Sequence, residues 1–122
     1  MKTLYVTVLA LLSAGIIATA AAAHPKLVAT NPSANAVVTI SPSAIRLTFS
    51  EDLNARFSGL ELKDKTGKKI ETGSVSFEPG NKKQLILPIV APLSAGAYDV
   101  AWHAVASDTH RIEGQYSFTV QQ

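Results

Sequence analysis

Alternation of apolar and polar residues is the feature of this sequence that most restricts its fold. Residues 45–49 read Ile-Arg-Leu-Thr-Phe, the period-two pattern of a strand with one buried face. The same alternation recurs later in the chain, and an opening segment at 26–29 completes about seven short strands. The later runs are at 60–62, 75–77, 85–87, 98–102 and 116–120.

Turn-forming residues separate these runs, as an all-β domain requires. They are Asn31-Pro32, Ser41-Pro42, Lys65-Thr66-Gly67, Pro79-Gly80-Asn81 and the segment 92–96. No long helical period is present, and we expect at most a turn or two of helix at 52–57. The pattern predicts an all-β, seven-stranded Greek-key β-sandwich of the immunoglobulin-like kind, a variant of the cupredoxin-like barrel.

The first 23 residues have the pattern of a cleaved signal peptide. Lys2 is followed by an uncharged run, 4–23, that ends in Ala21-Ala22-Ala23, where signal peptidase requires small residues. A membrane anchor is the competing interpretation, since about 20 apolar residues span a bilayer. The run closes on alanines, however, and no basic cluster follows. We expect cleavage after Ala23, export, and a single domain, 24–122, without a membrane span.

Charge and sulfur content limit the chemistry of the mature domain. Loss of Lys2 lowers the net charge from +2 (11 minus 9) to +1 (10 minus 9). This weak balance argues against a nucleic-acid partner, for which a basic stripe is expected. The sequence has no cysteine, and its single methionine is Met1. Disulfides are therefore excluded, and the mature domain has no sulfur ligand for a metal.

After cleavage, His24 would be the first residue and an unusual metal ligand. Its α-amine and imidazole Nδ1 can close a six-membered chelate ring around one metal ion. The α-amine also titrates near pH 8, well below lysine. Pro25 has no backbone N–H, which prevents a metal from displacing successive amide protons along the terminal peptide. The remaining ligands must then come from elsewhere in the fold.

The segment Ser107-Asp108-Thr109-His110 offers such ligands. Asp108 and His110 are spaced i, i+2, so in extended backbone both side chains project to the same side. With His24 they make three nitrogens and one oxygen, a set that favours Cu(II) first and Ni(II) second. Zinc would normally prefer a tetrahedral site. Cu(I) is disfavoured because its soft sulfur ligands are missing.

Each of these features also has an ordinary structural interpretation. A histidine after a signal peptide can be chance, and the Asp-x-His motif is weak by itself because Asp and Thr in a loop also favour turns and caps. His103 should lie on the opposite face of its strand from Trp102, so we expect a solvated strand histidine. Trp102 itself should belong to the core. The lysines around the predicted 65–67 turn should protect a sheet edge: Lys63, Lys65, Lys68 and Lys69.

The ordered motifs of the chain resemble the CopC copper-resistance proteins. The motifs are His24-Pro25-Lys26-Leu27-Val28, Leu47-Thr48-Phe49-Ser50-Glu51, Phe57-Ser58-Gly59, and the stretch from Pro92 to Tyr98 continuing through Trp102, the 107–110 segment, Gly114 and 116–118. The resemblance implies a periplasmic β-sandwich that binds Cu(II) through His24, Asp108 and His110. It also implies that Glu51 lies just outside the ligands and orients one of them.

The resemblance further implies copper handling with an inner-membrane CopD-type transporter as partner. Some members of the family carry a methionine-rich Cu(I) site, but residues 63–78 here contain neither methionine nor histidine. We therefore expect a monomeric, single-site Cu(II) carrier or buffer and no enzyme activity. Two alternatives remain: a histidine-brace copper oxidase or monooxygenase, and a metal-free adhesive or structural module. Asp108 as an added ligand, and the absence of an obvious aromatic platform, favour binding over catalysis.

Overall fold

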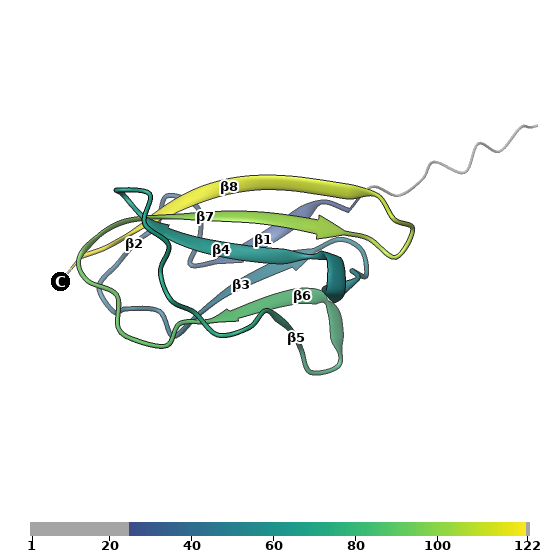
Figure 1. The fold of residues 1–122 in the computed structure, drawn as a ribbon, viewed down its shortest axis with the longest axis horizontal. Helices are drawn as coiled ribbons and strands as arrows, with labels where there is room; N and C mark the ends of the chain where they lie inside the picture. Colours follow the sequence, from purple (N-terminus) through teal and green to yellow (C-terminus); the bar gives the residue numbers. More distant parts are fainter. Residues whose placement is uncertain (1–24, 122) are drawn as a thin grey trace, which may run out of the picture.

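The structure, a computed structural model, describes residues 25–121 as two facing β-sheets (Figure 1). The predicted signal peptide and His24 lie outside these residues. Within them are eight strands and one short 3-10 turn, η1. Their bounds are β1 Leu27–Asn31, β2 Val37–Val38, β3 Ala44–Phe49, η1 Ala55–Phe57, β4 Gly59–Asp64, β5 Ser76–Glu78, β6 Asn81–Pro88, β7 Gly96–Val105 and β8 Arg111–Val120.

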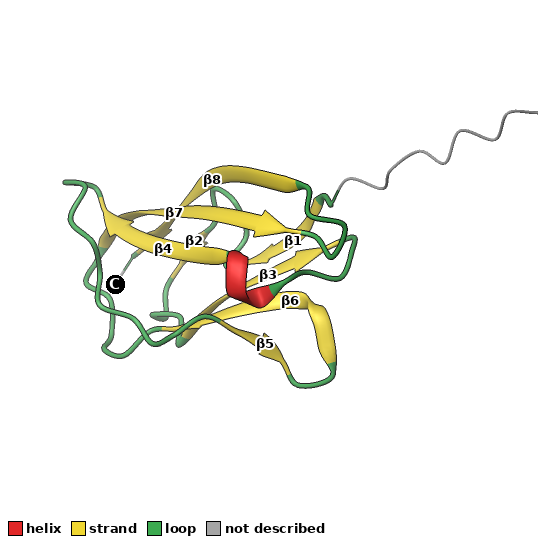
Figure 2. Cartoon of the chain, turned by 45° about the vertical axis from the view of Figure 1, so that its right-hand side comes forward, coloured by secondary structure: helices red, strands yellow, loops and turns green. Residues whose placement is uncertain are grey.

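The two sheets have four strands each, in the orders β1-β3-β6-β5 and β2-β8-β7-β4. The predicted β-sandwich is confirmed, and each of the seven predicted runs corresponds to a strand. The eighth strand, β2, is two residues long, too short to show alternation, and it pairs in parallel with the end of β8. Figure 2 shows η1 as the single helical turn drawn in the sandwich, within the segment where a turn or two of helix was predicted.

Alternation along the strands produces the core between the sheets. The buried residues of β3, Ile45, Leu47 and Phe49, are at most 1% exposed, whereas their neighbours Arg46 and Thr48 face outward. They meet apolar side chains of the other sheet, each of which contributes about 1.5–3 kcal/mol on full burial. The facing residues that are fully buried are Leu62, Val100, Phe118 and Val120.

Aromatic side chains join the two sheets, as predicted for Trp102. The rings of Phe49 on β3 and Trp102 on β7 meet edge to face, with centroids 5.3 Å apart. Such pairs add to the stability that burial alone supplies. Tyr98 stacks on Phe118 at 5.7 Å, which ties neighbouring strands of one sheet together.

Within residues 25–121, no helix has the length and apolar character needed to cross a membrane.

Tyr116 makes the fold sensitive to alkaline pH. Burial raises the pKa of its phenol from 10.0 to about 12, against a smaller opposing effect of Thr30. In the unfolded chain the phenol of Tyr116 ionises near pH 10.0, before it does so in the folded protein. The folded state therefore keeps its full stability below pH 10.0 and loses stability as the pH rises toward about 12. Tyr116→Phe removes this ionisation. Between these two pH values, urea unfolding should show wild type losing stability relative to the variant. A pH-independent difference between the two proteins would contradict the assignment.

Candidate metal centre

Asp108 and His110 contact each other in the loop between β7 and β8. The Nδ1 of His110 lies 3.0 Å from Oδ2 of Asp108, and the backbone N–H of His110 donates to Oδ1 at 3.2 Å. One carboxylate therefore holds both the ring and the backbone of the histidine. The two side chains are 47% and 42% exposed for His110 and Asp108 respectively, so a metal ion can reach them from solvent.

The backbone of this loop is a tight turn. The N–H of Thr109 donates to the carbonyl of Ala106 at 2.9 Å, and the N–H of Ala106 donates to the carbonyl of His110 at 3.0 Å. Thr109 has a φ of 75°. This is the left-handed region, which a β-branched residue adopts only when its surroundings enforce it.

A second segment, residues 50–53, lies beside the loop and connects it to the start of β1. The N–H of Ser107 donates to the carbonyl of Asp52 at 3.2 Å, and Leu53 forms an isolated bridge with Ala106. Ser50 and Lys26 exchange two hydrogen bonds of 2.9 Å. The start of β1, the end of β3 and the loop thus meet at one end of the sandwich, on the right in Figure 1.

Of the two predicted site residues outside the loop, Glu51 is described by the structure and His24 is not. Glu51 is half-buried in the 50–53 segment, between Ser50, which bonds to Lys26, and Asp52, which bonds to the loop. His24 lies outside the described residues. Among residues 25–121, no three His, Cys, Asp or Glu side chains gather as a metal site. Asp108 and His110 therefore pair as candidate ligands without a third such side chain from this part of the chain.

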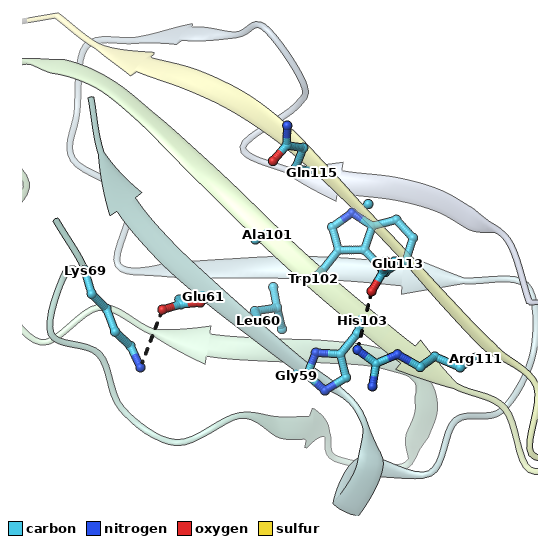
Figure 3. A pocket seen from close by; sticks show the side chains of 11 residues that line it. Gly59, Leu60, Glu61, Lys69, Ala101, Trp102, His103, Arg111, Glu113 and Gln115 are labelled. Carbon is cyan, nitrogen blue, oxygen red and sulfur yellow. Dashed lines mark hydrogen bonds and ion pairs between the residues drawn. The ribbon is translucent and has the colours of Figure 1, made fainter. Parts of the chain in front are cut away.

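His103 lies on the outer face of the β4-β7-β8 sheet, opposite in direction to Trp102 as predicted. Its cross-strand partners are Gly59 and Glu113. The ring covers Gly59 closely: a Cβ there would lie 2.8 Å from the ring's Cε1. Figure 3 shows this ring in a groove of mixed charge, where Arg111 pairs with Glu113 at 3.4 Å. His103 is thus half-buried against the sheet instead of fully solvated.

The predicted lysine cluster surrounds the end of β4, which is an edge strand of its sheet. Lys65, Lys68 and Lys69 are exposed, and Lys69 lies 3.8 Å from Glu61. This placement suits protection of a sheet edge.

Sequence reasoning missed the 50–53 segment as a support for the loop. Its contact with Ser107 is made by the backbone carbonyl of Asp52, and backbone contacts leave no signature in residue type. The available signal was the Leu47-Thr48-Phe49-Ser50-Glu51 motif, of which only Glu51 was assigned a role.

Together these features define a small β-sandwich domain with a histidine–carboxylate pair at one end, next to the start of its first strand. Residues 27–121 match the CopC domain, and the chain belongs to the CopC family. Copper resistance protein C of Escherichia coli is 39% identical over 121 residues, covering 92% of this chain and 95% of that protein.

Two solved structures share the fold across nearly their whole length. CopC from Methylosinus trichosporium OB3b aligns with a TM-score of 0.74 and 32% identity, covering 80% of this chain and 94% of that one. PcoC, a methionine-rich copper resistance protein from Escherichia coli, aligns with a TM-score of 0.72 and 38% identity, covering 81% and 100%. The predicted family resemblance is confirmed.

Strain at Thr109 is testable by substitution. Thr109→Asn should stabilise the metal-free protein by about 1 kcal/mol, because Asn tolerates positive φ whereas strained positions cost about 1–3 kcal/mol. Thr109→Val keeps the branched Cβ and is the control that should give no gain. Urea unfolding measures both. A loss of stability with Asn would mean that contacts of the threonine side chain outweigh the backbone strain.

Proposed function

We propose that this protein is an exported copper(II)-binding protein that acts in the periplasm as a copper carrier or buffer. Membership of the CopC family and relatives named for copper resistance support copper as its cargo. The observation that carries the proposal is the contact between His110 and Asp108 on an exposed loop at the end of the sandwich where β1 begins.

The proposed ligands are the α-amine and imidazole of His24, the imidazole of His110 and the carboxylate of Asp108. Nδ1 of His110 and Oδ2 of Asp108 lie 3.0 Å apart. Two neighbouring ligand atoms with metal bonds of about 2.0 Å have a similar separation, so both atoms could bind the same ion. Glu51, in the adjacent segment, is the proposed residue beyond the ligands.

His24 is close enough in sequence to complete this set. Lys26 is held by two hydrogen bonds to Ser50, and Ser107 is held to Asp52. His24 is two positions before Lys26, and two residues of extended chain span at most about 7 Å. The N-terminus of the cleaved protein would therefore remain near the end of the sandwich that carries Asp108 and His110.

The absence of sulfur supports a single Cu(II) site. The sequence contains no cysteine and, after cleavage, no methionine. Nitrogen and oxygen ligands favour Cu(II) over Cu(I), which prefers thiolates and thioethers. PcoC is described as methionine rich; this chain differs from it in that respect.

Binding is preferred to catalysis as the role of the site. A redox enzyme keeps an open metal position for its substrate, whereas Asp108 provides a fourth ligand and negative charge that favours the oxidised ion. A monomer that carries Cu(II) could deliver it to an inner-membrane CopD-type transporter, and we propose that protein as the partner.

Adding a residue before His24 should weaken Cu(II) binding, because the free amine is then no longer part of His24. A mature protein with one extra residue before His24 loses the chelate between amine and imidazole, so its Cu(II) affinity should fall by about a hundredfold or more. Competition with a chromophoric chelator measures this. The control is the same protein after proteolytic removal of the added residue, which should regain the native affinity. Equal affinities with and without the added residue would exclude the proposed amine ligand.

His110 and His103 form a matched pair for testing the second histidine. Loss of a residue that merely supports a metal ligand costs about 10–100-fold in affinity, so His110→Ala should cost at least that much. His103→Ala should leave the Cu(II) affinity near that of wild type, because the ring packs over Gly59 on the outer face of the sheet. Chelator competition and EPR of the Cu(II) complexes measure both variants. Equal losses would mean that the site is not built on the 107–110 loop.

A further inference from the structure

We propose that Ser58 is a positioning residue for the Asp108–His110 loop, acting through hydrogen bonds that hold the end of β7. This inference rests on the proposed copper function for its effect on affinity. Its structural part concerns the metal-free protein and stands on the contacts alone.

Among residues 25–121, Ser58 is the one polar residue that is buried. It is 8% exposed and lies just before β4. Its hydroxyl donates to the carbonyl of Asn54 at 2.8 Å and accepts from the N–H of Val105 at 3.0 Å. Val105 is the last residue of β7. One hydroxyl thus joins the 3-10 turn to the residue from which the loop departs.

The hydroxyl replaces a backbone partner that the fold cannot provide at this position. The β4–β7 ladder ends with Gly59 opposite His103. Continued by two residues, it would bring Phe57 opposite Val105, but Phe57 belongs to η1 and not to a strand. The N–H of Val105 would therefore lack the carbonyl of a neighbouring strand, and an unsatisfied buried N–H is unfavourable. The side chain of Ser58 satisfies it.

Other contacts show that the chain from 52 to 58 encloses the base of the loop. The N–H of Asn54 donates to the carbonyl of Val105 at 2.8 Å, so Val105 is held on both its backbone groups. The next two residues, Ala106 and Ser107, contact Leu53 and Asp52. Asp108 follows directly. A displacement of Val105 would therefore also displace Asp108 and His110, which follow it closely in the chain.

Metal ligands must be held to within about 0.5 Å to bind tightly, and supporting hydrogen bonds supply this precision. Replacing Ser58 with alanine leaves the Val105 N–H and the Asn54 carbonyl without the hydroxyl in a buried place. The end of β7 should then open more often, and the loop should sample conformations in which Asp108 and His110 do not face the same ion.

The test compares Ser58→Ala with a matched control, Ser41→Ala. The Ser41 hydroxyl also accepts a backbone N–H, that of Leu93 at 2.7 Å, but just before the start of β3, away from the strand end that adjoins the loop. Two quantities are measured on each protein at a temperature where it is folded. One is Cu(II) affinity of the mature protein by chelator competition, and the other is amide hydrogen exchange of residues 105–110 in the metal-free protein.

Ser58→Ala should bind Cu(II) about tenfold more weakly than wild type, as for other residues that support a metal ligand. Its amide exchange should accelerate in 105–110 more than elsewhere. Ser41→Ala should retain wild-type affinity and loop exchange, even if its overall stability falls. Ser58→Thr, which keeps the hydroxyl, should retain slow loop exchange.

The proposal is wrong if Ser58→Ala and Ser41→Ala lose the same affinity, or if loop exchange is unchanged in Ser58→Ala. Should Ser58→Ala not fold, Ser58→Cys replaces it for the exchange measurement alone, since a thiol has similar shape but forms weaker hydrogen bonds; unchanged loop exchange there also overturns the proposal. A wild-type protein that binds no Cu(II) would refute the proposed function, while the exchange measurement would still decide the role of Ser58.

Discussion

The pairing of β7 with β8 is the interaction on which the rest of the structure depends. Each strand is ten residues long, and the two pair from Gly96↔Val120 to Val105↔Arg111. Residues of this hairpin, including Val100 and Phe118, are buried against the opposite sheet. The loop that connects the two strands of the hairpin is therefore carried by a packed core, and an exposed loop on a rigid scaffold is where binding residues are commonly found.

The candidate metal centre combines this rigidity with exposure. The side chains of Asp108 and His110 are 42% and 47% exposed, so neither is held by burial. Their geometry instead comes from hydrogen bonds within the loop and from the 50–53 segment beside it. The same segment binds Lys26. One stretch of chain thus connects the residue before β1 to a loop more than 80 residues later, which a site assembled from both would require.

Local patterns predicted what local physics determines. Alternation located seven strands, because a strand with one buried face must alternate. The i, i+2 spacing predicted that Asp108 and His110 would project to the same side of an extended backbone; the two side chains are in contact, but across a tight turn with Thr109 at positive φ. The strand β2 was not predicted, because two residues cannot show the alternation of a strand and its pairing depends on backbone groups. His24 remains a prediction from the signal-peptide pattern.

Long-range register was not predictable from residue types. Gly59 was named only within the Phe57-Ser58-Gly59 motif, yet it lies under the ring of His103, a residue 44 positions away that had been expected to be solvated (103 minus 59). Ser58 belongs to the same motif and had no predicted role. Its role depends on η1 displacing a strand just where the N–H of Val105 needs a partner. Both contacts become visible only when β4 and β7 are placed side by side.

The strained Thr109 and the buried Ser58 have related explanations. A branched residue at positive φ persists only where neighbouring structure determines its conformation. Here both ends of the turn are fixed: Ala106 bonds to Thr109 and His110 within the loop, and Val105 is held by Ser58 and Asn54. If the base of the loop were free to move, Thr109 could relax toward negative φ, and the backbone of His110 would turn with it. The strain is thus a consequence of a loop held firmly enough to keep an imidazole against a carboxylate in water.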